Sequence, residues 1–203
     1  MAALFDMSAF VLVSPGKAKV RELQQWLNSL YSDYTGIMPC DGIYQRNTNV
    51  ALIYALQRAL GMDANIANGN FGPGTEAALR DVELSTGSSG ELVQVTQWGL
   101  YLNGVYDHDI DDVYSSNVAD AVADFRKFMQ YDTSSDVLKI ADYTVIKGLL
   151  TSNGDTSRGS VAIDCATQLT ATDVSNLASH GITTVGRYLT GTVGSGSSER
   201  QRT

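Results

Sequence analysis

One short pattern, which occurs three times, constrains the fold of this 203-residue chain more than any other feature. In segments 41–52 and 68–79, a glycine-containing turn with a single aromatic residue leads directly into a run of helix-forming residues. Segment 111–122 has a weaker version of the same layout. Because a recurring spacing indicates a recurring structural unit, the sequence predicts three copies of one small unit built from a turn and helices.

The apolar residues around these turns follow a helical period. In segment 17–31, Val20, Leu23 and Leu27 fall on one face at a spacing near that of an α-helix. Segment 47–60 is apolar around most of its circumference, which favours a buried helix shared by two neighbouring units. Further helices are expected over 76–84 (capped by Thr75), 91–102, 117–130 and 142–150.

The helix expected over 91–102 also matches the first helix residue for residue. An alignment without gaps pairs Gln25 and Trp26 with Gln97 and Trp98. We therefore expect the two helices to occupy the same place in their units, with these paired residues in equivalent positions.

The residue pattern changes near residue 150. Segment 151–160 is rich in Ser, Gly, Asn and Asp, which is typical of a linker and predicts a domain boundary. A strand (161–164), a helix (171–179, capped by Thr170) and a second strand (182–188) then form a βαβ unit. A parallel sheet needs helices on both of its faces, so this unit is incomplete. The predicted fold class is mainly α, small helical bundles followed by the incomplete βαβ start of an α/β barrel.

The composition excludes several classes of partner. Hydrophobic residues make up 43% of the chain and charged residues 18%, which supports a packed core. The formal charge of -8 disfavours nucleic acid or an anionic membrane as a partner. No apolar run is long enough to cross a bilayer, and the N-terminus lacks the features of a secretion signal. The sequence does not set the oligomeric state, for which a monomer is the expectation.

One acidic segment invites comparison with a calcium-binding loop. Aspartates alternate over 107–112, with His108 among them. A helix-loop-helix calcium site needs glycine at its sixth position and an acid at its twelfth, where this chain has Asp112 and Val118. His108 and His180 have no further ligands at a useful spacing. The sequence therefore predicts no metal site and no cofactor, and the segment is expected to be a solvated turn.

Two of the turns share an Asp-Gly or Asn-Gly pair, an aromatic residue two positions later, and a threonine four positions after that. The matching residues are Asp41, Gly42, Tyr44 and Thr48 in the first turn, and Asn68, Gly69, Phe71, Gly72 and Thr75 in the second. In this arrangement the chain resembles the bacterial peptidoglycan-binding repeat family, whose small modules place such a loop between two helices. The third turn keeps Asp111 and Tyr114. It has Asp112 and Val118 in place of the glycine and the threonine, so it is a degenerate copy.

The two predicted C-terminal strands end in chemically distinctive residues. Segment 162–165 reads Ala-Ile-Asp-Cys and segment 186–189 reads Gly-Arg-Tyr-Leu. In these segments the chain resembles the opening of a glycoside-hydrolase-like barrel domain. The resemblance implies a catalytic role for Asp164, at the strand end where α/β barrels carry catalytic groups. Arg187 and Tyr188 are expected to line the same pocket. Glycoside hydrolysis normally takes two carboxylates, and no second one lies at a later strand end.

These resemblances set the predicted domain order. The order is the tail of a preceding repeat or linker (1–16), repeats one and two sharing the helix over 47–60 (17–86), a degenerate third repeat (87–150), a linker (151–160), and the truncated N-terminal part of a glycoside-hydrolase-like domain (161–203). The chain is thus expected to be an internal piece of a larger protein.

The resemblance also implies which residues bind the ligand. An Asp-Gly turn leaves backbone amides free, and an aromatic ring beside it can stack on a sugar or a peptide. The predicted ligand-binding residues are Asp41, Gly42, Tyr44, Asn47, Thr48, Asn68, Asn70, Phe71, Gly72 and Thr75. The alternative for the aromatic residues is a place in the core under each loop. For the polar residues it is an ordinary role in forming the turn.

The leading hypothesis is a non-catalytic module that binds peptidoglycan, or a related cell-wall polymer, and targets a glycoside-hydrolase-like domain to the wall. Such a protein acts outside the cell or in association with the cell wall, although no signal peptide is visible. This chain is expected to be inactive by itself. Two alternatives stay open: part of a wall-lytic glycoside hydrolase with Asp164 as one catalytic acid, and a scaffold that binds other proteins through its helices.

Overall fold

The computed structural model describes four stretches of the chain, residues 15–151, 162–165, 169–179 and 184–187. The two four-residue stretches are described by their backbone alone. The chain divides into two compact units, residues 1–155 and 156–203. Most of the predicted N-terminal tail (1–16) and of the predicted linker (151–160) lies outside the described residues.

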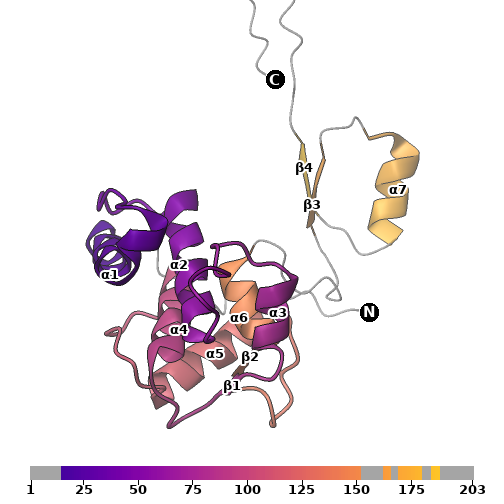
Figure 1. Cartoon of the computed structure of the whole chain (residues 1–203). Coiled ribbons are helices and arrows are strands. Elements are labelled where there is room, and N and C mark those ends of the chain that lie inside the picture. Colours follow the sequence, from indigo (N-terminus) through magenta and orange to yellow (C-terminus); the bar gives the residue numbers. More distant parts are fainter. Residues whose placement is uncertain (1–14, 152–161, 166–168, 180–183, 188–203) are drawn as a thin grey trace, which may run out of the picture. The chain divides into compact units, whose positions relative to one another are not determined.

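The first compact unit is built almost entirely from helices (Figure 1), and we call it the helical unit. Its elements are α1 (Lys17–Thr35), α2 (Arg46–Ala59), α3 (Pro73–Leu79), β1 (Glu83–Leu84), α4 (Glu91–Leu102), α5 (Ser116–Met129), β2 (Ala141–Asp142) and α6 (Tyr143–Leu150). The prediction of a mainly α fold is confirmed. No helix within the described ranges combines the length and the apolar character that a membrane span needs.

The local sequence explains where the first helices begin and end. α1 buries Val20, Leu23 and Leu27 on one face and ends at Gly36, whose φ of 72° lies in the left-handed region that favours glycine. In α2 every side chain from residue 51 to residue 57 is buried. Its apolar circumference therefore makes it the central helix of the unit.

The third helix differs from its prediction. It was expected over 76–84 with Thr75 as its cap, but α3 begins at Pro73 and ends at Leu79. Proline suits the first turn of a helix because its backbone nitrogen needs no hydrogen-bond partner there. Thr75 consequently lies inside the helix, and residues 83–84 form β1, which pairs antiparallel with β2.

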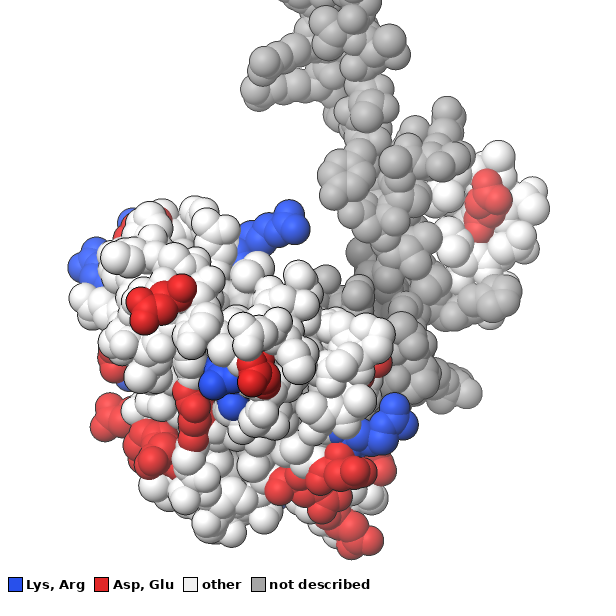
Figure 2. Space-filling model, viewed as in Figure 1, with Lys and Arg blue, Asp and Glu red and all other residues white. Residues whose placement is uncertain are grey.

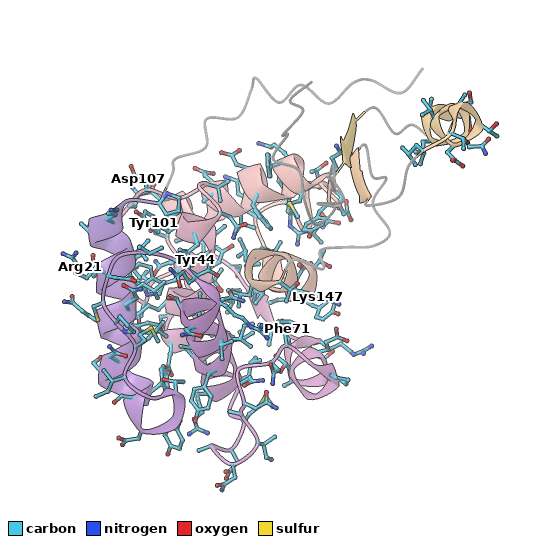
Figure 3. All side chains as sticks on the ribbon, turned by 90° about the horizontal axis from the view of Figure 1, so that it is seen from above. Arg21, Tyr44, Phe71, Tyr101, Asp107 and Lys147 are labelled. Carbon is cyan, nitrogen blue, oxygen red and sulfur yellow. The ribbon has the colours of Figure 1, made fainter. Side chains whose placement is uncertain are left out.

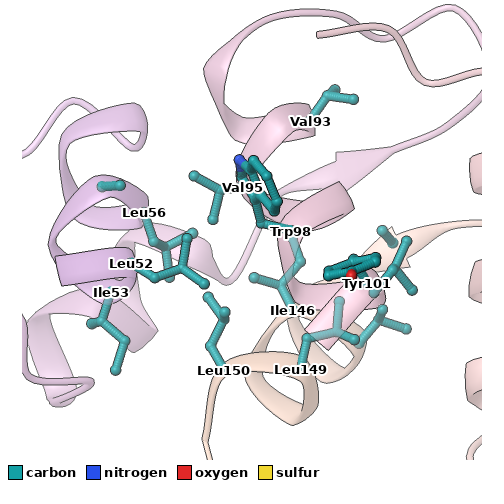
Figure 4. Packing of buried hydrophobic residues seen from close by; sticks show 14 of the residues in the cluster. Leu52, Ile53, Leu56, Val93, Val95, Trp98, Tyr101, Ile146, Leu149 and Leu150 are labelled. Atoms are coloured by element: carbon teal, nitrogen blue, oxygen red, sulfur yellow. The ribbon is translucent and has the colours of Figure 1, made fainter. Parts of the chain in front are cut away.

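α2, α4 and α6 pack around one hydrophobic core. Figure 4 shows Leu52 and Leu56 of α2 near Trp98 of α4, together with Ile146 and Leu150 of α6. All five side chains are buried. Burial of each contributes on the order of 1.5–3 kcal/mol relative to an exposed side chain. These three helices therefore form the rigid frame from which the loops project.

A buried arginine joins α5 to β2 and α6. The side chain of Arg126 is 1% exposed, and its Nη2 atom lies 2.7 Å from Oδ2 of Asp142. The guanidinium also donates to the backbone oxygens of Ile140, at 2.9 Å, and Asp132, at 3.3 Å. Asp142 in turn caps α6 by accepting a hydrogen bond from the backbone N–H of Val145. The charge of Arg126 is thus fully partnered, as a buried charge requires.

The second compact unit contains β3 (Ala162–Cys165), α7 (Ala171–Ser179) and β4 (Thr184–Arg187). β3 and β4 pair in parallel, with Asp164 opposite Gly186. Thr170 caps α7 as predicted, because its hydroxyl accepts a hydrogen bond from the backbone N–H of Asp173. The carboxylate of Asp173 accepts one from the backbone N–H of Thr170 in return, which completes a capping box. The predicted βαβ order is present in the described residues.

Replacing Arg126 by methionine is expected to lower the free energy of unfolding of the helical unit by about 3 kcal/mol, because it strands a partly buried carboxylate and two backbone oxygens. Urea unfolding followed by tryptophan fluorescence measures this, since both tryptophans belong to the helical unit. The control is Lys127→Met, which breaks only an exposed ion pair with Asp124 and should cost less than about 0.5 kcal/mol. Equal stability of the two variants would contradict this account of Arg126.

Candidate functional site

Three loops of the helical unit contain the predicted binding motifs. The first loop (residues 36–45) joins α1 to α2, the second loop (residues 60–72) joins α2 to α3, and the third loop (residues 103–115) joins α4 to α5. A glutamine from the helix before each loop reaches into that loop and hydrogen-bonds to its backbone. These brace glutamines, each at most 2% exposed, are Gln24, Gln57 and Gln97.

Gln24 holds the first loop through both ends of its side-chain amide. Its Nε2 atom donates to Oδ1 of Asp41 at 2.9 Å and to the backbone oxygen of Ile43 at 3.1 Å. Its Oε1 atom accepts a hydrogen bond of 2.9 Å from the backbone N–H of Gly42. The Oγ1 atom of Thr48, at the start of α2, lies 3.4 Å from Nε2. The spacing of Asp41, Gly42 and Thr48 in the first motif thus has a structural cause, because all three hydrogen-bond to one buried amide.

Gln57 holds the second loop in the same way. Its Nε2 atom donates to Oγ1 of Thr75 at 2.8 Å and to the backbone oxygen of Asn70 at 2.9 Å. Its Oε1 atom accepts hydrogen bonds from the backbone N–H groups of Asn68, at 2.8 Å, and Gly69, at 2.9 Å. Thr75 is buried and serves this network, which is why it does not cap α3.

The third loop is only partly braced. Gln97 donates to Oδ1 of Asp111 at 2.7 Å and to the backbone oxygen of Val113 at 3.1 Å. Its Oε1 atom is buried and has no hydrogen-bond partner among the described residues. The third loop therefore lacks the backbone N–H that Gly42 and Gly69 donate to Oε1 in the first two loops.

The backbone of the third loop pairs with the segment that precedes α4. Ser89 and Val113 form an isolated antiparallel bridge, and the N–H of Tyr114 donates to the oxygen of Ser88 at 2.8 Å. The N–H of Gly90 donates to the oxygen of Asp112 at 2.7 Å. These bonds close the edge of the third loop, so its backbone is less available to a ligand.

The glycines of the first two loops allow the chain to lie against the preceding helix. Gly42 and Gly69 have φ angles of 74° and 72°, which L-residues rarely adopt. A Cβ atom on Gly42 would lie 2.3 Å from the backbone oxygen of Lys17, and one on Gly69 would lie 2.7 Å from that of Val50. Lys17 and Val50 each precede their brace glutamine by seven residues. The first two loops therefore dock on equivalent positions.

The braces correct the alignment of α1 with α4. The prediction that paired Gln25 with Gln97 is wrong by one residue, because Gln24 is the buried glutamine and Gln25 is exposed. The pairing of Trp26 with Trp98 led to this wrong alignment. Trp26 is only partly buried, whereas Trp98 is 1% exposed, so the two rings do not occupy equivalent positions.

The hydrogen bonds from the braces also keep two loop carboxylates ionised. The side chain of Gln24 and then the backbone N–H of Ile43 lower the pKa of Asp41 below its usual range. The side chain of Gln97 and then the backbone N–H of Val113 do the same for Asp111. Both bonds stabilise the charged form, since the amide groups donate to the carboxylate. Asp41 and Asp111 thus act as charged hydrogen-bond acceptors within their loops.

The three motif aromatics occupy different environments. Tyr114 is fully buried and its hydroxyl donates to the backbone oxygen of Lys139, and Phe71 is partly buried against the core. Tyr44 is 38% exposed, and its hydroxyl donates to Oδ1 of Asn49 at 2.5 Å. Burial of its hydroxyl end raises the pKa of Tyr44 to about 12. Of the three rings, that of Tyr44 is the most exposed.

Tyr44 lies in a groove that we call the Tyr44 groove. Figure 3 shows this ring toward the middle of the helical unit when the unit is seen from above. The groove has a volume of about 400 Å³ and runs between the start of α2 and the ends of α4 and α6. It is lined by Tyr44, Gln45, Arg46, Asn49, Leu102, Asn103, Gly148, Leu149, Leu150 and Thr151.

A second cleft lies between the first and second loops, and we call it the inter-loop cleft. Its volume is about 380 Å³. The end of α1 and the first loop form one wall, α2 forms the floor, and the second loop forms the other wall. The lining residues are Tyr34, Thr35, Ile37, Met38, Pro39, Asn47, Val50, Tyr54, Ala64, Ala67, Asn68 and Gly69.

The structure distributes the predicted ligand-binding residues between these places. Asn47 and Asn68 line the inter-loop cleft, and Tyr44 lines the Tyr44 groove. Gly72 is the N-cap residue of α3, next to Phe71. The remaining predicted residues, which make hydrogen bonds within the braced loops, are Asp41, Gly42, Thr48, Asn70 and Thr75. Contact of any of these residues with a ligand stays a prediction.

The predicted catalytic and pocket residues lie in or after the second unit's strands. Asp164 is the third residue of β3, and Arg187 is the last residue of β4, paired with Cys165. Only their backbone is described. Tyr188 lies outside the described residues. The parallel register therefore brings the backbones of Asp164 and Gly186 together without defining a pocket.

The acidic segment at the start of the third loop lines a third, polar cleft. Asp107, His108 and Asp109 share this cleft of about 350 Å³ with Lys19 and Tyr101, and Figure 3 shows Asp107 at the edge of the unit. Within the described part of the chain, no group of three or more His, Cys, Asp or Glu side chains is placed to hold a metal ion. We therefore propose no metal site in this segment.

Comparison with known proteins assigns the helical unit to a family. Residues 13–150 match the family described as FadG/YbfG, PGDB-like domain, where PGDB means peptidoglycan-binding-like. The chain belongs to this family of PGDB-like domains. The match covers all three loops, the whole inter-loop cleft and every lining residue of the Tyr44 groove except Thr151.

Two relatives of this PGDB-like domain come from Bacillus subtilis (strain 168). The chain is 46% identical over 195 residues to a protein named Uncharacterized protein YbfG, and 38% identical over 196 residues to one named Uncharacterized protein FadG. The aligned region is 95% of this chain in both cases, but it is 26% of YbfG and 33% of FadG. No solved structure matches the chain.

Replacing Gln57 by methionine, which has a similar shape, is expected to destabilise the helical unit by about 2–4 kcal/mol, because two backbone N–H groups lose their acceptor. The same change at Gln97 should cost at least about 1 kcal/mol less, since its Oε1 atom already lacks a partner. Urea unfolding measures both. The exposed Gln25→Met is the control and should change stability by less than about 0.5 kcal/mol. Equal losses at Gln57 and Gln97 would contradict the unequal bracing.

Proposed function

We propose that the helical unit is a non-catalytic module that binds peptidoglycan of the bacterial cell wall. The observation that carries this proposal is the match of residues 13–150 to the PGDB-like domain family. The charge distribution is compatible with it, because acidic side chains gather on the lower part of the face shown in Figure 2 and disfavour polyanionic partners. Such a module acts outside the cell or within the wall itself.

The inter-loop cleft is the binding site in this proposal. It combines an exposed aromatic ring, Tyr34, with two amide side chains, Asn47 at the start of α2 and Asn68 in the second loop. The side chain of Asn47 makes no hydrogen bond to another described residue, so its donors and acceptor are available. The packed helices α1 and α2 and the braced second loop hold these groups at a fixed separation. Preorganisation of this kind reduces the entropy lost on binding.

We also propose that the first two loops are copies of one unit and that a glycoside-hydrolase-like domain follows the helical unit in the larger protein. The equivalent bonds made by Gln24 and Gln57 support the interpretation of the first two loops as copies of one unit. The parallel β3–α7–β4 arrangement supports a following glycoside-hydrolase-like domain. A module bound to the wall would keep such a domain near its polymer, which raises the local substrate concentration even when each site is weak.

The chain should sediment with insoluble peptidoglycan when the two are mixed and centrifuged. Tyr34→Ala is expected to reduce the bound fraction severalfold, because it removes the aromatic wall of the cleft. Leu30→Ala is a matched control, since Leu30 lies one turn earlier on α1 and is similarly exposed at 52% but does not line the cleft. The control should sediment like the unchanged chain.

A chain that stays in the supernatant would refute wall binding and favour the alternative of a protein-binding scaffold. Equal losses in Tyr34→Ala and Leu30→Ala would place the contact outside the inter-loop cleft. Both variants leave the brace glutamines untouched, so their urea midpoints should stay close to that of the unchanged chain.

The alternative of a wall-lytic enzyme is favoured by one observation, the position of Asp164 near the C-terminal end of a parallel strand. If Asp164 is a catalytic acid of the intact parent protein, Asp164→Asn should abolish the clearing of wall-containing gels. Sedimentation with the wall should be unchanged, because the helical unit is intact. Clearing that survives the substitution would remove Asp164 from the mechanism.

A further inference from the structure

We infer that the inter-loop cleft binds the N-acetylated amino-sugar backbone of the wall polymer rather than its peptide stems. The inference rests on the proposed function, because it names the part of the polymer that the same site takes. Its basis is the chemistry of the residues that line the cleft. The volume of about 380 Å³ is within the range of small-ligand sites, about 300–1,000 Å³.

The cleft has no charged side chain among its lining residues, although the chain carries a formal charge of -8. Peptide stems carry free carboxylates and amines. Protein sites for carboxylates use Arg, Lys or several N–H donors, because a desolvated charge without a partner is costly. An N-acetylated sugar ring is neutral and brings no such cost. The uncharged lining therefore selects the sugar backbone over the stem.

The aromatic wall of the cleft is already fixed in place. The rings of Tyr34 and Tyr54 stack with their centroids 5.5 Å apart and their planes 23° apart. Tyr54 is 3% exposed and anchored in the core, whereas Tyr34 is 59% exposed. With one face resting on Tyr54, the ring of Tyr34 presents its other face to solvent. A flat aromatic face held in this way suits the apolar C–H face of a pyranose ring.

The amide groups at the cleft match the hydroxyl and acetamido groups of a sugar. Oδ1 of Asn68 accepts a hydrogen bond from the backbone N–H of Asn70, which fixes the amide so that its NH2 group is left over. That NH2 group donates to no described residue. Asn47 also lines the cleft, and its side chain makes no hydrogen bond to another described residue. Together they supply donors and an acceptor without a charge.

The floor of the cleft offers a place for an acetyl methyl group and one further polar atom. Val50 of the floor, with Ala64 and Ala67 of the adjoining second-loop wall, gives it an apolar surface. Tyr54 also lines the cleft, and its buried hydroxyl has no hydrogen-bond partner among the described residues. An unpartnered buried hydroxyl is costly, and a ligand that reaches it recovers a hydrogen bond. The floor thus combines the apolar and polar character of an N-acetyl group.

Calorimetric titration of the full chain tests this inference with three soluble probes: a tetramer of N-acetylglucosamine, the corresponding deacetylated tetramer, and a free stem tetrapeptide. We expect the acetylated tetramer to bind, and the other two to bind at least roughly tenfold more weakly. Tyr34→Ala should weaken binding of the acetylated tetramer by roughly tenfold or more, while Tyr34→Phe, which keeps the ring, should retain the affinity. Leu30→Ala should also bind normally.

Two results would overturn the inference and leave wall binding intact. One is a chain that sediments with peptidoglycan yet binds the stem tetrapeptide and not the acetylated tetramer. The other is tetramer binding that survives Tyr34→Ala and is lost in Tyr44→Ala, which would move the sugar to the Tyr44 groove. A chain that does not sediment with the wall at all refutes the proposed function itself. Urea midpoints of the variants confirm that each remains folded.

Discussion

The buried glutamine at the base of each loop is the interaction on which the helical unit depends. Gln24 and Gln57 are enclosed by the core, and an amide in that environment must satisfy both its oxygen and its nitrogen. The loop backbone supplies the partners. Because the partners are fixed in position, the loop has one conformation, and the glycines that dock against Lys17 and Val50 follow from it. The residues of the repeated motif therefore stabilise the conformation of the loop.

The bonds to the brace glutamines determine which side chains are left free to recognise a ligand. Asp41, Thr48 and Thr75 hydrogen-bond to the brace glutamines. They therefore help to hold the loop conformations that form the cleft. The groups left over on the surface are an exposed ring at the end of α1, an amide at the start of α2 and an amide in the second loop. The third loop shows the converse case. Only the Nε2 end of Gln97 has hydrogen-bond partners among the described residues, and the backbone edge of the loop pairs with segment 87–90. The third loop therefore has a structural role.

The sequence predicted the elements that depend on local signals. The helix over 91–102, the helix over 171–179 and the cap at Thr170 follow from period and capping chemistry, which act over a few residues. The brace glutamines were missed because nothing local marks a glutamine as buried, although Gln24 and Gln57 each follow their glycine-docking residue by seven positions. The inter-loop cleft was not predicted because its walls come from three separate segments between residues 34 and 69, whose relative positions are set only when the helices pack.

Nuclear magnetic resonance of the full chain during titration with soluble wall fragments tests the central claim most directly. We expect the largest shifts of side-chain amide signals at Asn47 and Asn68, while the signals of Gln24 and Gln57 stay nearly unchanged because the braces do not move. Shifts confined to the Tyr44 groove, or large changes at Gln24 and Gln57, would contradict it. The first result would place the ligand elsewhere, and the second would show that the loops are not held rigid.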